Sequence, residues 1–138
     1  MNPVLTIVLG ITLLTVVGIA FGGTFLLRVG NGSVPANDLQ KTFFRAGHAH
    51  AGVLVTLGLL VAVLGHVAGA SPAWATGGAI AVLTAAIFIP AGFFLSVLGP
   101  NPQRPGPMMA SVWIGATSLV AGLVVSGVAV LAAGITAL

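Results

Sequence analysis

The sequence predicts an all-α integral membrane protein built as a bundle of four transmembrane helices. Of its 138 residues, 58% are hydrophobic and only 4% are charged, whereas a soluble domain usually carries about 25% charged residues. Several apolar runs also exceed the roughly 18 residues that a helix needs to cross the hydrocarbon core of a bilayer. A chain of this composition cannot cover its own surface with polar groups, so we expect the lipid bilayer to surround it.

Polar, glycine and proline clusters divide the chain into four spans of a single membrane domain. The first span ends at Arg28 and the polar segment VGNGSVPAND, and Asn37 or Asp38 is expected to cap the second. The turn AGASPA separates the second span from the third, and the proline-rich segment GPNPQRPGP separates the third from the fourth. The expected spans cover residues 4–27, 38–67, 74–98 and 108–138.

The few charges predict how these spans are oriented. Arg28, Lys41 and Arg45 lie in or beside the first loop, and Arg104 lies in the third, whereas the chain ends and the second loop carry no lysine or arginine. By the positive-inside bias, the first and third loops face the cytoplasm and both termini lie outside. We therefore expect a multi-pass protein of the cell membrane, most simply a bacterial inner membrane. Four basic residues against one acid form no basic patch, so no nucleic-acid partner is predicted.

Small residues at helical spacing predict how the spans pack in lipid, where apolar contact alone gives little driving force. On the fourth span, five small residues lie within about 80° of one another at 100° per residue. They are Ser111, Gly115, Ser118, Gly122 and Ser126. Two shorter sets are Gly18 and Gly22 on the first span, and Gly47, Ala51, Gly58 and Gly65 on the second. We expect the set on the fourth span to form its packing face.

The stretch FFRAGHAHAGVLV, residues 43–55, carries the chemically distinctive side chains. It places Arg45, His48 and His50 at the loop end of the second span, and His66 lies at the opposite end. Ionisable groups at membrane depth are costly and rare, so they indicate a function. His48 and His50 are about 200° apart around a helix and cannot bind one ion from the same face. His48 and His66 share a face but lie about 27 Å apart along the axis.

These restrictions leave one histidine as an axial ligand whose partner comes from elsewhere. Met108 and Met109 begin the fourth span on the same side of the membrane. One of them could therefore ligate a heme together with His48 or His50 within one chain. A bis-histidine site would need a second protomer, and a metal ion on either histidine would need further ligands. We count Arg45 among the residues of this candidate cofactor site.

The stretch RAGHAHAGVLVTLGLLVAVLGH, residues 45–66, resembles the Arg-x-x-His-x-His start of a helix in the heme-copper oxidase and nitric oxide reductase superfamily. The resemblance includes short membrane proteins related to the large subunit of those enzymes. It implies that His48 or His50 supplies an axial heme ligand. The superfamily's copper ligands and further heme ligands have no counterpart, because the third and fourth spans contain no histidine. A centre that reduces oxygen or nitric oxide is therefore not expected.

Three functions are compatible with the sequence. In the first, the histidines bond loop carbonyls, Arg45 meets lipid phosphate, and the protein is an accessory subunit or homo-oligomer that packs against other membrane helices. In the second, His48 or His50 binds heme or a metal ion. In the third, the protein transports a small solute, although the embedded parts of the spans lack the charged groups of a proton or ion relay. Because only histidine could serve as a base and no nucleophile accompanies it, no enzymatic activity is predicted.

The charge distribution predicts which loops a membrane-impermeant reagent reaches. The chain contains no cysteine, so a single cysteine introduced into NGSVPAND or NPQRPGP would be its only labelling site. An impermeant maleimide should leave these variants unlabelled in intact cells and label them after permeabilisation. A cysteine in AGASPA is the reverse control and should react in intact cells. If the two long loops react from outside intact cells, the predicted orientation is wrong.

Overall fold

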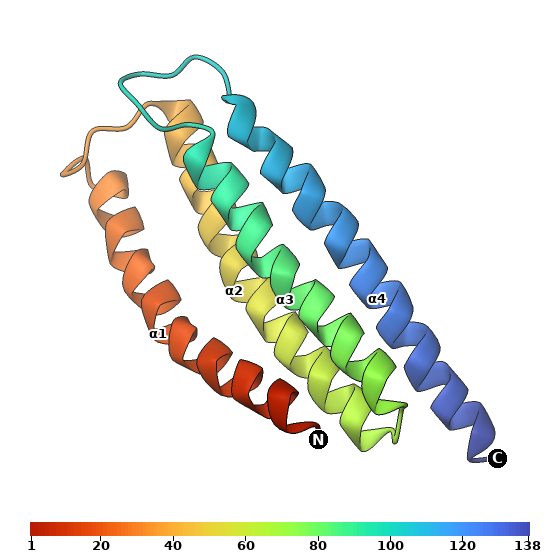
Figure 1. Cartoon of the computed structure of the whole chain (residues 1–138). Coiled ribbons are helices and arrows are strands. Elements are labelled where there is room, and N and C mark those ends of the chain that lie inside the picture. Colours follow the sequence, from red (N-terminus) through yellow and green to blue (C-terminus); the bar gives the residue numbers. More distant parts are fainter.

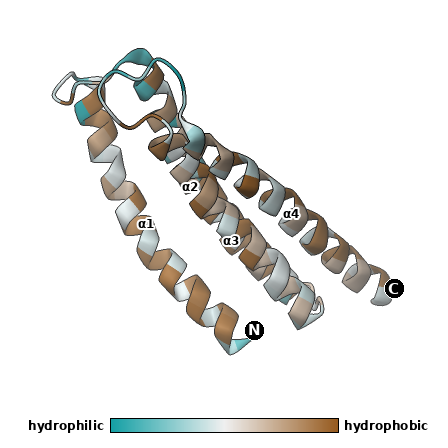
Figure 2. Cartoon of the chain, turned by 45° about the horizontal axis from the view of Figure 1, so that its top comes forward, coloured by the Kyte–Doolittle hydropathy of each residue, from teal (hydrophilic) through white to brown (hydrophobic).

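The computed structural model describes all 138 residues and contains four long helices and no strand (Figure 1). A short 3-10 turn, η1, leads into the last helix. The elements are α1 (Pro3–Gly30), α2 (Asp38–Val67), α3 (Pro72–Leu95), η1 (Pro107–Met109) and α4 (Ala110–Thr136). All four helices are long and apolar enough to cross a membrane, and Figure 2 shows the hydrophilic residues gathered at the end that carries the two long loops. The prediction of four long apolar helices is confirmed.

The helices stand side by side in chain order, so the bundle is an open row (Figure 1). α3 packs extensively against both α2 and α4, whereas α1 packs more loosely against α2. α1 and α4 form the two edges of the row and do not close onto each other (Figures 1 and 2). Both termini lie at one end, opposite the α1–α2 and α3–α4 loops (Figure 1). This agrees with four spans, while the side of the membrane on which the termini lie stays a prediction.

The start of α2 is fixed by a reciprocal pair of hydrogen bonds. The side-chain oxygen of Asn37 accepts from the backbone N–H of Gln40 at 2.9 Å, and the side-chain oxygen of Gln40 accepts from the backbone N–H of Asn37 at 3.1 Å. This capping box satisfies two backbone donors that a helix start leaves unpaired. Of the two residues that the sequence offered as N-cap, Asn37 is the one used.

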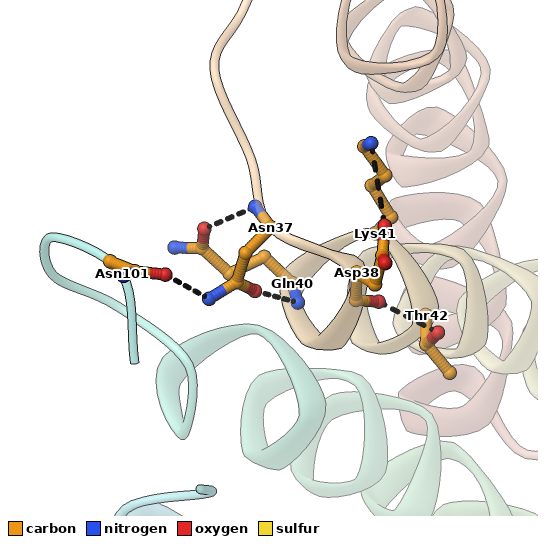
Figure 3. A network of polar contacts seen from close by, with 6 residues as sticks. All are labelled: Asn37, Asp38, Gln40, Lys41, Thr42 and Asn101. Carbon is orange, nitrogen blue, oxygen red and sulfur yellow. Dashed lines mark hydrogen bonds and ion pairs between the residues drawn. The ribbon is translucent and has the colours of Figure 1, made fainter. Parts of the chain in front are cut away.

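The same two side chains bind the loop between α3 and α4 (Figure 3). The NH₂ group of Gln40 donates to the carbonyl oxygens of Val97 and Gly99, both at 3.1 Å. The NH₂ group of Asn37 donates to Asn101 Oδ1 at 2.9 Å and to the carbonyl oxygen of Pro102 at 2.8 Å. α3 ends at Leu95 rather than at the expected residue 98, and the Val97 and Gly99 carbonyls beyond its end accept hydrogen bonds from Gln40. We call these bonds the loop clip.

The interface between α3 and α4 depends on glycine. A Cβ atom added at Gly122 would lie 2.9 Å from both the Gly78 carbonyl oxygen and the Val82 backbone nitrogen. Side chains of any size at this position would therefore force the two backbones apart. Gly115 has similarly little room, since an added Cβ would lie 2.9 Å from the backbone nitrogen of Ile89.

Two serines of α4 add hydrogen bonds across the same interface. The Ser111 hydroxyl donates to the Phe88 carbonyl at 2.7 Å, and the Ser118 hydroxyl donates to the Ala81 carbonyl at 2.8 Å. Donors and acceptors are each one heptad apart, and their order reverses between the helices, as antiparallel packing requires. The small-residue face predicted for the fourth span is therefore confirmed, with Ser111, Gly115, Gly122 and Ser126 buried.

Glycines also bring α2 against α3. A Cβ atom added at Gly47, Gly58 or Gly65 would lie closer than 3.0 Å to a side chain of α3, on Phe94, Leu83 and Ala75 respectively. These three glycines of the small-residue set predicted on the second span therefore face α3. On the first span, Gly22 lies in an interface but nothing lies within 4 Å of a Cβ added at Gly18.

The structure predicts that Gly122→Leu loosens the bundle. The larger side chain overpacks the α3–α4 interface, and overpacking of this kind typically costs about 1–3 kcal/mol, so we expect lower resistance to heat and to SDS without loss of membrane insertion. Gly77→Leu on α3 is the matched control, because nothing lies within 4 Å of a Cβ added there. Thermal unfolding in mild detergent measures both. Equal stability of the Gly122→Leu variant and the unaltered protein would contradict the packing.

Candidate functional site

The candidate site lies on α2, two to three turns beyond the loop clip. Gly47 packs against Phe93 and Phe94 of α3, and this contact fixes how α2 is rotated about its axis. The neighbouring residues of the motif must then point to either side of that contact, because each residue advances by about 100°.

His48 points toward α1. A Cβ atom added at Gly22 would lie 3.6 Å from His48 Nδ1, and one added at Gly23 would lie 3.7 Å from Nε2. The imidazole therefore occupies the space that two consecutive glycines leave open, and its side chain is half-buried there. The ring forms no hydrogen bond within the chain, so its polar atoms have only water or lipid headgroups as partners.

His50 points toward α3. Its Nδ1 lies 2.7 Å from the Ala46 carbonyl oxygen, and because a carbonyl only accepts, the proton resides on Nδ1. The ring also lies beside Phe93, with 5.2 Å between the ring centroids. The residue is otherwise exposed. In the neutral ring, this bond leaves Nε2 of His50 able to accept a hydrogen bond or bind a metal.

The two histidines therefore belong to different sides of the row. The His48 side holds a cleft of about 500 Å³ between α1, α2 and α3, where Ala51 and Val55 continue the line of His48 along α2. The side of α2 that carries His50 continues with Val61 and Leu64, which line a cleft of about 390 Å³ between α2 and α4. Joint ligation of one ion by His48 and His50 is excluded by this arrangement, as their angular separation predicts.

The remaining predicted site residues are dispersed around the loop end. α3 lies between α2 and α4, and Gly92 of α3 packs against the backbone of Met108 and Val112. His48 faces away from α4, so a His–Met pair within one chain would have to use His50. Met108 is exposed and Met109 half-buried, while Arg45 is fully on the surface.

A metal ion at these histidines would need ligands from outside the chain. No group of three or more His, Cys, Asp or Glu side chains lies close enough together to hold one. His66 lies at the other end of α2 and is exposed. The ligation of heme or metal by His48 or His50, with Met108, Met109 and Arg45 nearby, therefore stays a prediction.

Comparison with known proteins adds no relative to this picture. No family model, no curated protein and no solved structure matches the chain. The resemblance of residues 45–66 to the heme-copper oxidase superfamily therefore stays a prediction.

Two features of the site were missed from the sequence. Gln40 joins α2 to the end of α3, although the pattern of an N-cap Asn with a Gln three residues later was visible as a capping box. The Gly22–Gly23 pair accommodates the ring of His48. Adjacent glycines inside an apolar helix indicate that something approaches the backbone closely, but they do not indicate what.

Proposed function

We propose that this protein is a small integral membrane subunit that packs against transmembrane helices of a partner protein or of further copies of itself. The open row of helices carries this proposal. In the most apolar stretch of 18 residues of α1, only 11% is buried within the chain, and the same share is buried in the segment that forms α4. Because α1 and α4 lie at the edges of the row, each leaves a long face that other helices can cover.

The character of these faces supports close approach by a helix. Nothing lies within 4 Å of a Cβ added at Gly127 or Gly134 of α4, nor at Gly10 or Gly18 of α1. Exposed small residues permit close backbone contact between helices in lipid. The cleft between α2 and α4 offers a groove beside Gly127, lined also by Val61, Leu64, Leu123, Ser126, Val130 and Leu131.

A photoreactive residue in place of Leu123 should identify the partner helix. Leu123 lines the α2–α4 cleft, whereas Val128 is exposed outside it and lies about 140° around α4 from Leu123. We expect irradiation of native membranes to give a protein adduct from position 123 and none from position 128. The adduct mass distinguishes a second copy of the chain from another protein. Absence of any protein adduct from position 123 would contradict the proposal.

A second candidate function, heme binding, is favoured by the hydrogen bond of His50. Metal-ligating histidines usually donate one ring N–H to a backbone carbonyl or a carboxylate, which fixes the tautomer and the ring orientation. His50 does this through Nδ1 and the Ala46 carbonyl at 2.7 Å. The stripe of α2 below His50 is apolar, with Leu57, Val61 and Leu64, and would suit the face of a porphyrin. This arrangement favours His50 over His48 as the axial ligand.

Heme binding through His50 predicts a defined set of absorption spectra. Protein purified in mild detergent from heme-replete cells should show a Soret band that His50→Ala abolishes. His66→Ala should keep the band, since His66 lies about 24 Å farther along the helix, and His48→Ala should keep it because His48 faces α1. Loss of the sixth ligand in Met109→Leu or Met108→Leu should shift the band.

The outcome also separates the two candidate functions. Colourless protein with a blank metal analysis, from cells that load a control cytochrome, would reject heme binding and leave the subunit proposal untouched. A band that survives His50→Ala but is lost in His48→Ala would show that the ligand was assigned to the wrong side of α2.

A further inference from the structure

The charges of the chain gather at the loop end, and three of them lack an acidic partner. Asp38 is the sole acidic residue of the sequence, and its carboxylate pairs with Lys41 at 3.6 Å. Arg28, Arg45 and Arg104 therefore have no carboxylate side chain with which to pair. We call these three arginines the basic rim.

The basic rim surrounds one end of the row. Arg28 lies in the last turn of α1, Arg45 lies two turns into α2, and Arg104 lies in the loop between α3 and α4; all three are exposed. The hydrophilic colouring in Figure 2 concentrates at this end. The opposite end carries no lysine, arginine or acidic side chain, and His66 is its only titratable side chain. The arginine side chains would therefore attract a ligand of negative charge to the loop end.

The depth of the rim matches that of lipid headgroups. Arg45 and His66 are about 31 Å apart along α2 at 1.5 Å per residue, which is close to the thickness of the hydrocarbon core of a bilayer, about 30 Å. With His66 at one boundary, Arg45 lies at the other. A long arginine side chain at that level extends its guanidinium toward the phosphates.

We propose that the basic rim binds the phosphate groups of anionic phospholipids, such as phosphatidylglycerol, in the leaflet at the loop end. The planar guanidinium presents two parallel N–H donors to phosphate oxygens. A zwitterionic lipid offers the same phosphate, but its own ammonium group compensates the charge. Because the rim is not neutralised within the chain, it favours the lipid that brings net negative charge. This inference requires neither a partner helix nor a bound heme, although Arg45 also belongs to the candidate cofactor site.

The two tryptophans of the chain allow lipid contacts to be measured separately at each end. Trp113 lies near the start of α4 at the loop end and is 71% exposed, and Trp74 lies near the start of α3 at the opposite end and is 62% exposed. Trp74→Phe leaves Trp113 as the reporter, and Trp113→Phe leaves Trp74. In vesicles, lipids with dibrominated acyl chains quench whichever tryptophan they touch.

Dibrominated phosphatidylglycerol should quench Trp113 more strongly than dibrominated phosphatidylcholine does, with about a fivefold preference per engaged arginine. Trp74 should show no preference. Combined Arg28→Gln, Arg45→Gln and Arg104→Gln substitution should remove the preference at Trp113, with Arg104→Gln the largest single effect because Arg104 leads into α4. Combined Asp38→Asn and Lys41→Gln substitution is the matched control and should keep it, since it removes an ion pair without changing the net charge.

Two further measurements test the proposal even if the triple variant fails to fold. About 1 M salt, where the screening length is about 3 Å, should weaken the preference in the unaltered protein, and native mass spectrometry should show fewer retained phosphatidylglycerol molecules in each single variant. Equal quenching of Trp113 by both lipids in the unaltered protein overturns the proposal. A preference that is unaffected by salt, is equally strong at Trp74, or survives in the folded triple variant also overturns it.

Discussion

The rest of the structure depends on the close backbone contact of α3 with its two neighbours. In lipid, apolar burial gives little driving force for helix association, so close packing and interhelical hydrogen bonds must supply it. Glycines provide the packing, with Gly58 of α2 on one side of α3 and Gly122 of α4 on the other, and Ser111 and Ser118 provide the bonds. The three helices α2, α3 and α4 form one tightly packed unit for this reason.

The rotation of α2 within this unit determines where its polar side chains go. Because Gly47 and Gly58 must face α3, His48 is turned to one side of that contact and His50 to the other. His48 then meets α1 at its paired glycines, whereas His50 binds the Ala46 carbonyl through Nδ1 on the side of α2 that continues toward α4. Two histidines that look like one motif in the sequence are two separate groups in the structure.

The sequence was sufficient to predict the features that follow from composition and from the helical period of 3.6 residues per turn. Apolar length defines the four helices, and the 100° advance per residue locates the face of α4 around Gly122 and the divergence of His48 from His50. A helical period gives relative angles only, so it could not tell which histidine faces α1. The bond from Gln40 to the Val97 carbonyl also escaped it, because the two residues lie far apart in the sequence.

α1 differs from the other helices in how it is held. It contacts the rest of the row through Leu5 and Leu9 near its start and through Val29, against Phe44, near its end. Between these contacts lies the cleft with α2 and α3, where the hydroxyls of Thr12, Thr15 and Thr84 all bond carbonyls of their own helices. The cleft therefore presents methyl groups and suits lipid chains. Apart from His66, the ionisable side chains lie at the loop end, where His50 and the unpaired arginines can recognise a charged ligand.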